Sequence, residues 1–224
     1  MKFTRRFAIG LTTAVALMAF QGAAHAEVEK VTIAVGGKSL FYYLPLTIAE
    51  QRGYFKEEGV NVEIVDFAGG SKALQAVVGG SADVVSGAYE HTIKLQGKKQ
   101  YFTAFVQQAR APQIVLAVST KTMPNYKTLA DLRGKKIGVT APGSSTNMVA
   151  SFVLDGAGVN SKEVSFIGVG AGSGAVAAMK TGQIDAIANL DPVISSLERD
   201  GAIDVSVDAR NIEWTLEEFH GVMP

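Results

Sequence analysis

The sequence predicts an α/β fold built as two similar lobes, and three observations support this. The stretch from Gly70 to Glu90 recurs without a gap from Gly172 to Pro192, in a register shifted by 102 residues. Strand-like and helix-like runs alternate along the chain, which is typical of parallel sheets built from βαβ units. Hydrophobic residues make up 47% of the chain and charged residues 19%, a balance that supports a sizeable folded core.

The repeat is best explained by a shared supersecondary unit. The identical pairs are Gly70/Gly172, Ser71/Ser173, Ala73/Ala175, Ala76/Ala178, Gly80/Gly182 and Asp83/Asp185. Two copies this far apart do not form a solenoid. We expect one loop, helix and strand of this kind in each lobe, and a functional surface where the lobes face each other.

The first half contains four expected strands. The β-rich run 31–35 ends at two glycines, and 60–67 alternates apolar and polar residues. Residues 83–86 and 101–107 are the other two. Helices are expected at 45–52, from the N-cap Ser71 to the glycines at 79–80, and up to about residue 95.

The second half continues the alternation. Residues 113–119 (QIVLAVS) are strongly β-forming and are interpreted as the crossing between lobes. Strands at 137–140 and 164–168 alternate with helices from 142 to about 154 and from about 192 to 199, and residues 129–136 read as a short helix running into a strand. The predicted division is residues 1–26 as a signal peptide, 27–112 as lobe one, 113–119 as the hinge, 120–205 as lobe two and 206–224 as the start of a return crossing.

The N-terminus has the pattern of a secretory signal peptide. A basic start with Lys2, Arg5 and Arg6 precedes a mostly apolar run from Phe7 to Phe20, and residues 24–26 (AHA) form a small-residue cleavage site. About 14 apolar residues are too few for a membrane-spanning helix, which needs about 20. Export to a bacterial periplasm is therefore expected, by the general or the twin-arginine route.

Composition excludes several classes of function. Without residues 1–26, which hold three basic residues and no acidic one, the chain has 18 Lys and Arg against 21 Asp and Glu, a net charge of −3. This balance gives no electrostatic footprint for nucleic acid and no basic tract for membranes. Because the chain has no Cys, disulfides, thiolate nucleophiles and Cys-ligated metals are impossible. Two His remain after cleavage, without metal-ligand spacing, and no metal site is expected.

Small hydroxyl and amide residues gather at the predicted carboxyl ends of strands, where α/β sheets bind ligands. Helix starts offer free N–H groups and a partial positive charge, which suit a small oxyanion. Any single Ser there can simply cap a helix. The candidate ligand-binding residues are Lys38, Ser39, Gly70, Ser71, Tyr89, Glu90, Gly143, Ser144, Ser145, Thr146, Asn189 and Asp191.

Each lobe also places one carboxylate just past the repeated strand. Glu90 in lobe one or Asp191 in lobe two would suit a cationic or polar end of the ligand, so we expect an organic anion or zwitterion. Asp191 can equally cap the helix that begins at Pro192. The aromatic run 41–43 either borders the pocket or packs in the first turn of a helix.

Enzyme signatures are weak. No G-x-S-x-G nucleophile elbow follows a strand convincingly. Gly170, Gly172 and Ala175 fit the permissive dinucleotide pattern G-x-G-x-x-A. The lobe-one counterpart lacks this fingerprint, and a glycine turn with a helix cap explains both copies. A nucleotide-dependent enzyme stays an alternative, as does a sensor with the same fold; no cofactor is expected.

Six motifs are spread over most of the mature chain: 45–55 (PLTIAEQRGYF), 58–60 (EGV), 80–84 (GSADV), 129–139 (LADLRGKKIGV), 143–146 (GSST) and 182–186 (GQIDA). Together they resemble the periplasmic substrate-binding proteins of ABC importers. The resembling branch is the NMT1/THI5-like one, with nitrate-, alkanesulfonate-, taurine- and thiamine-precursor-binding members.

This resemblance implies a type II clamshell of two α/β lobes that closes on a ligand. It implies a monomer that delivers a small molecule to an ABC permease in the inner membrane and catalyses nothing. The family includes a eukaryotic enzyme that makes a thiamine pyrimidine with a cysteine-rich motif, which this chain lacks. Family chains normally cross back to finish lobe one, whereas this sequence stops at residues 221–224, so we expect a C-terminally extended version to be more stable.

Overall fold

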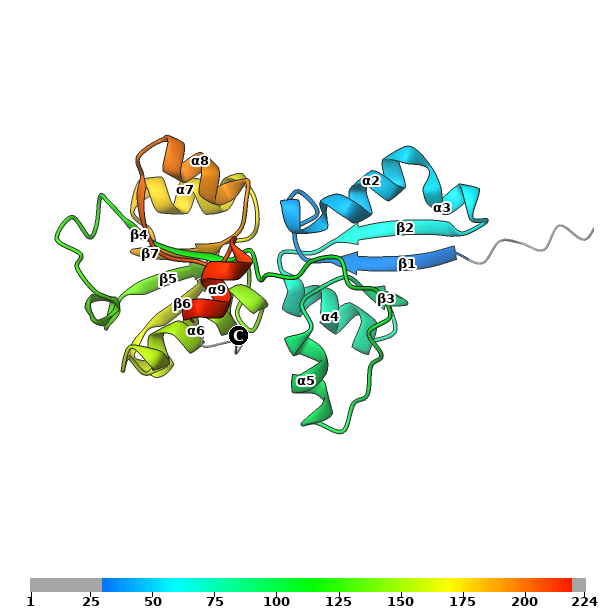
Figure 1. The fold of residues 1–224 in the computed structure, drawn as a ribbon, viewed down its shortest axis with the longest axis horizontal. Coiled ribbons are helices and arrows are strands. Elements are labelled where there is room, and N and C mark those ends of the chain that lie inside the picture. Colours follow the sequence, from blue (N-terminus) through cyan, green and yellow to red (C-terminus); the bar gives the residue numbers. More distant parts are fainter. Residues whose placement is uncertain (1–29, 219–224) are drawn as a thin grey trace, which may run out of the picture.

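The computed structural model describes residues 30–218, and Figure 1 shows two α/β lobes side by side. The predicted signal peptide and the last six residues lie outside the described part. Lobe one holds β1 (Lys30–Val35), the 3-10 helix η1 (Phe41–Tyr43), α2 (Leu44–Arg52), α3 (Tyr54–Glu57), β2 (Asn61–Asp66), α4 (Gly70–Val78), β3 (Val84–Val85) and α5 (Glu90–Gln96). Lobe two holds β4 (Val115–Ser119), η2 (Leu129–Leu132), β5 (Lys136–Val139), α6 (Ser145–Gly156), η3 (Ser161–Glu163), β6 (Ser165–Gly168), α7 (Ser173–Thr181), β7 (Ala186–Asn189), α8 (Val193–Arg199), β8 (Ile203–Asp208) and α9 (Ile212–Glu218).

The sheet of lobe one is parallel, in the order β2-β1-β3. Helices α2 and α3 lie on one side of it, and α4 and α5 lie on the other (Figure 1). The small side chains Ala73 and Ala76 are buried, which lets α4 approach β1 closely. The carboxyl ends of β1 and β2 point toward lobe two (Figure 1), and the start of α4 contacts lobe two through Ser71.

The sheet of lobe two has five strands in the order β6-β5-β7-β4-β8. Strands β5, β6 and β7 are parallel, whereas β4 runs antiparallel to both of its neighbours. Helices α7 and α8 cover one face and α6 covers the other (Figure 1). Every residue of β4 is buried, because β4 lies inside the sheet between β7 and β8.

The repeat seen in the sequence is a repeat in the structure. The side chain of Asp83 accepts a hydrogen bond from Thr32 N at 2.8 Å, and that of Asp185 accepts one from Lys136 N at 3.0 Å. In each copy this carboxylate fixes the neighbouring parallel strand. Gly80 and Gly182 both have positive φ, at 76° and 81°, and end the matched helices α4 and α7.

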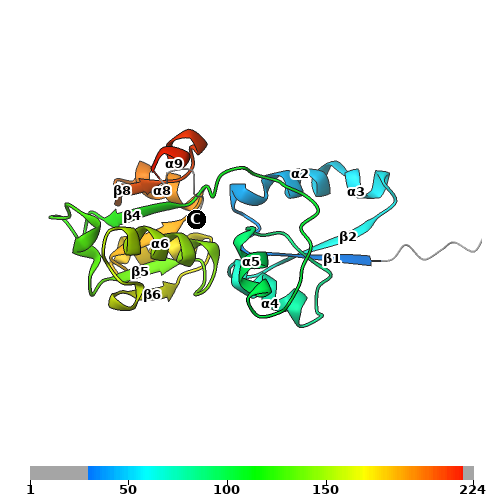
Figure 2. The same ribbon diagram turned by 60° about the horizontal axis from the view of Figure 1, so that its bottom comes forward.

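The structure differs from the expectations in four respects. Residues 101–107 form no strand, and the exposed side chains Tyr101, Phe105 and Val106 pack against little. The sheet of lobe two is mixed rather than parallel, because β4 and β8 enter it antiparallel. Strand β8 was not expected. The chain passes between the lobes in the segment before β4 (Figure 2), and β4 itself belongs to the second sheet.

Within residues 30–218, no helix is both long and apolar enough to span a bilayer.

Candidate functional site

The starts of helices α4 and α6 meet across the two lobes. Ser71 N, in the first turn of α4, donates to Ser144 Oγ at 3.0 Å, and the two hydroxyls lie 3.1 Å apart. Ser71 Oγ also donates to the carbonyl of Pro142 at 3.0 Å. Ser144 is 1% exposed. Two helix N-termini, each with a partial positive charge, thus meet at one buried spot between the lobes.

Backbone packing at this contact leaves no room for larger side chains. A Cβ on Gly69 would lie 2.9 Å from both the Cβ of Ala141 and Ser144 Oγ. Gly37 has φ of 104°, and a Cβ there would lie 2.3 Å from the Cβ of Ala171 in lobe two. Gly37, in the loop after β1, and Gly69, in the loop after β2, are therefore required for close approach of the lobes.

The loop 36–39 is held by charges within lobe one. Asp66 Oδ1 accepts from the backbone N–H groups of Gly37 and Lys38 at 2.8 and 2.7 Å. The ammonium of Lys38 turns back to Glu50, with a shortest Nζ–Oε distance of 2.8 Å. Ser39 Oγ donates across the lobes to Ala171 O at 3.3 Å. Lys38 thus contributes its backbone to this region while its charge is paired elsewhere.

Several candidate residues of lobe two bond within their own lobe. Thr146 Oγ1 accepts from Thr140 N at 3.1 Å, which ties the start of α6 to the end of β5. The side chain of Asn147 accepts from Gly143 N at 2.8 Å. Asn189 is fully buried and donates to Gly170 O at 3.1 Å. These bonds fix the shape of the loops that carry Gly143, Ser144 and Ser145.

Behind the start of α4 lie the buried His91 and the half-buried Glu90, whose Oε1 atom is buried. His91 is 3% exposed, and neither ring nitrogen has a hydrogen-bond partner in the described chain; the same holds for Glu90 Oε1. Desolvation lowers the pKa of His91, the negative charge of Glu90 opposes this, and Lys94 reinforces it. His91 is one of the two His without metal-ligand spacing, and the binding residues predicted from the sequence do not include it. The sequence feature that could have identified it is its position next to the candidate acid Glu90.

Two tyrosines lie near Glu90. Tyr42 and Tyr43 pack edge to face, with ring centroids 5.1 Å apart. Burial is the main cause that raises the pKa of Tyr43 to about 12, and the charges of Asp66 and Glu90 add to it. The Tyr43 hydroxyl accepts from Gly36 N at 3.2 Å. Phe41 and Tyr89, by contrast, are mostly exposed.

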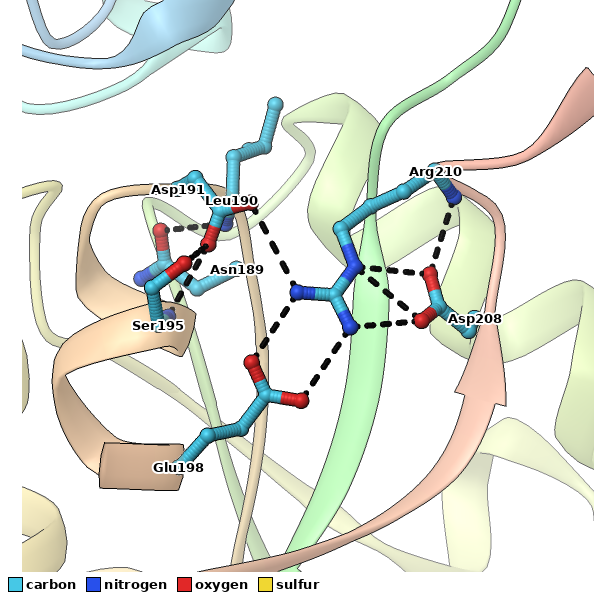
Figure 3. A network of polar contacts seen from close by, with 7 residues as sticks. All are labelled: Asn189, Leu190, Asp191, Ser195, Glu198, Asp208 and Arg210. Atoms are coloured by element: carbon cyan, nitrogen blue, oxygen red, sulfur yellow. Dashed lines mark hydrogen bonds and ion pairs between the residues drawn. The ribbon is translucent and has the colours of Figure 1, made fainter. Parts of the chain in front are cut away.

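Asp191 belongs to a charge network at the second lobe (Figure 3). Its Oδ1 accepts from Ser195 N at 2.9 Å and from Ser195 Oγ at 2.6 Å, so it caps the first turn of α8. Its Oδ2 lies 3.6 Å from Arg210 Nη1. The capping role considered from the sequence is the one seen here.

Arg210 is the centre of that network and was not identified from the sequence. Its guanidinium donates to Asp208 and, through Nη1 and Nη2, to Glu198 at 3.0 and 3.1 Å. The carboxylates of Asp208 and Glu198 raise its pKa beyond the ordinary value. Phe41, Gln113, Asp191 and Arg210 line a pocket of about 260 Å³ beside the chain crossing. Phe41 N donates to Asp191 O at 2.9 Å, which links the network to lobe one.

Among residues 30–218, no group of three or more acidic or His side chains is placed to hold a metal ion. Between the lobes, the starts of α4 and α6 offer hydrogen bonding, and Glu90 and His91 lie near the start of α4.

Known proteins share the fold of this chain. The NMT1/THI5 like family profile matches residues 40–210. A solved structure from Bordetella bronchiseptica RB50 is 65% identical, with a TM-score of 0.85 over 87% of this chain and 61% of that one. The alkanesulfonate-binding protein SsuA from Xanthomonas axonopodis pv. citri, bound to MOPS, is 24% identical, with a TM-score of 0.65 over 80% of this chain and 61% of its own.

A curated relative is similar at the level of sequence. The Bacillus subtilis (strain 168) protein YtlA, named as a binding protein, is 30% identical over 128 residues, which are 56% of this chain and 37% of YtlA. The chain thus spans little more than a third of YtlA and about three fifths of the two solved structures. Because the family profile matches well over half of the sequence and the lobes have the type II periplasmic-binding-protein fold, the chain belongs to the NMT1/THI5-like family.

Proposed function

We propose that this chain is the solute-binding component of an ABC-type importer. It holds a small organic anion or zwitterion between its lobes and delivers it to a permease of the inner membrane. The observation that carries the proposal is the meeting of the α4 and α6 starts at Ser71 and Ser144. Membership of the NMT1/THI5-like family and the shared fold with an alkanesulfonate-binding protein support it.

The binding chemistry follows from the helix starts. Each helix N-terminus contributes about 0.3–1 kcal/mol to an anion at an exposed site, and more where solvent is excluded. In the structure, Ser71 and Ser144 bond to each other across the lobes. An oxyanion that enters takes over these donors, and several charge-assisted bonds together reach micromolar affinity, about 8 kcal/mol. A sulfonate, a nitrate or a pyrimidine precursor with an anionic group fits this chemistry.

Opening and closing of the lobes admits and releases the ligand. The direct contacts between the lobes include hydrogen bonds, such as Ser39 Oγ to Ala171 O and Phe41 N to Asp191 O, and close packing of Gly37 on Ala171. Hinge closure around a ligand is a common motion of two-lobed binding proteins. The protein acts as a monomer in the periplasm and releases its ligand chemically unchanged.

Isothermal titration calorimetry with ethanesulfonate, taurine, nitrate and an aminopyrimidine phosphate tests this function. At least one of these compounds is expected to bind with micromolar affinity and without turnover. Ser144→Ala is expected to weaken binding roughly tenfold, the value of one hydrogen bond to a charged group. Ser165→Ala is the matched control and should bind like the wild type. Ser165 is the first residue of β6, at the end of the strand away from the helix starts. Binding that Ser144→Ala leaves unchanged, or conversion of a ligand, contradicts the proposal.

A further inference from the structure

The strongest unexplained feature is the buried pair Glu90 and His91 at the start of α5. Both nitrogens of His91 and Oε1 of Glu90 are buried and have no hydrogen-bond partner in the described chain. Leaving such a group unpaired costs about 1–3 kcal/mol, and more when the group is charged. Buried polar atoms in folded proteins are nearly always satisfied, so these three atoms call for a hydrogen-bond partner from outside the described chain.

The pair lies directly behind the anion-binding helix start. A Cβ on Gly70 would lie 3.2 Å from His91 Nε2, so this nitrogen is the nearest atom on that side of the α4 start. Gly70 precedes Ser71, whose N–H reaches Ser144 in lobe two. On the same helix as His91, Lys94 Nζ lies 4.0 Å from the Cβ position of Gly143 in lobe two. Helix α5 thus faces the space between the lobes together with α4.

The chemistry of the pair is that of an acceptor for N–H groups. Desolvation lowers the pKa of His91, which keeps the imidazole neutral at neutral pH, with one nitrogen free to accept. Glu90 Oε1 is a carboxylate acceptor next to it. The corresponding acid of lobe two, Asp191, is already bonded to Ser195 and lies near Arg210. An acceptor pair beside an anion-binding helix start suits a molecule that carries both a negative group and an amino group.

We propose that Glu90 and His91 select ligands that carry an amino group alongside their anionic group, with Glu90 Oε1 and His91 accepting the N–H donors. This inference rests on the proposed function, since the helix starts of α4 and α6 hold the anionic end. The ligand class is therefore an amino-substituted organic anion rather than a simple alkanesulfonate or nitrate.

Taurine and ethanesulfonate form a matched pair of probes, because they differ only by the amino group. In calorimetry on the full chain, taurine is expected to bind roughly tenfold or more tightly than ethanesulfonate. Glu90→Gln and His91→Gln, which keep the size and polarity of the side chains, should each reduce the preference for taurine toward unity. Circular dichroism and cooperative thermal unfolding of both variants show that they fold, and the ratio of the two affinities is the quantity that decides.

Lys98→Gln, on the exposed turn after α5, serves as the control and should keep the full preference. Equal affinity of the wild type for taurine and ethanesulfonate overturns this inference while the proposed function stands. A preference for taurine that both variants retain also overturns it. If neither sulfonate binds, the inference falls together with the sulfonate form of the proposed function.

Discussion

The Arg210 network allows a prediction whose size follows from the contacts. Replacing Arg210 by Met removes the guanidinium that bonds to Asp208 and Glu198, and leaves both carboxylates near that of Asp191. Hydrogen bonds to charged groups contribute about 1.5–3 kcal/mol, and exposed ion pairs less than about 1 kcal/mol. The Arg210 side chain is 29% exposed. We therefore expect a loss of about 2 kcal/mol in the free energy of unfolding.

Thermal unfolding followed by circular dichroism measures this loss. For a chain of this size, 1 kcal/mol lowers Tm by about 2–4 °C, so Arg210→Met is expected to melt about 6 °C below the wild type. Arg199→Met is the control, because the Arg199 side chain is 75% exposed and lies 3.5 Å from Asp200. If the two variants melt within about 1 °C of each other, the network does not stabilise the fold as argued.

Three further predictions follow from single sites. Gly37→Ala places a Cβ 2.3 Å from the Cβ of Ala171, which holds the lobes apart. The variant should therefore bind ligand at least tenfold more weakly in calorimetry. An affinity equal to that of the wild type would contradict the close approach of the lobes. Burial lowers the pKa of His91, so the unfolded chain binds the proton more readily. The free energy of unfolding should then fall as pH drops below about 6.5, by up to about 1.4 kcal/mol per pH unit. Urea titrations at several pH values measure this dependence, and in His91→Gln the free energy of unfolding should change less with pH. The hydrogen bond from Arg210 lowers the pKa of Asp208, so the stability that Asp208 contributes is present above about pH 3.9 and is lost as pH falls through its lower folded-state pKa. Over this pH range, the Tm of Asp208→Asn should therefore fall less than the Tm of the wild type.

The internal repeat is the part of the fold that the sequence predicted best. The same loop, helix and strand occur in both lobes, and Asp83 and Asp185 bond to the neighbouring strand in the same way. Local signals suffice here, because glycine turns, small buried residues and a helix period all lie within about twenty residues. The start of α4 and the start of α6 were likewise predicted at the lobe interface.

The misses concern pairing between distant segments. Residues 101–107 are β-forming by composition, but a strand needs a partner, and the edge strand β3 of lobe one is only two residues long. The antiparallel entry of β4 and β8 depends on contacts between residues about ninety positions apart, such as Leu116 with Val207. Propensity carries no information about such partners. Arg210 was missed for the same reason, since its three acidic neighbours come together only in the folded lobe.

The two candidate carboxylates show why a site needs more than a repeat. By sequence, Glu90 and Asp191 both follow the repeated strand, although the register pairs Asp191 with Tyr89 and Glu90 with Pro192. In the structure Asp191 bonds to the N–H and the hydroxyl of Ser195, four residues further along the chain, whereas the residue four positions after Glu90 is Lys94. Glu90 Oε1 is buried without a hydrogen-bond partner among the described residues, while Asp191 caps α8. Under the proposed selection of amino-bearing ligands, the carboxylate that its own lobe leaves unbonded, Glu90, therefore sets the selectivity.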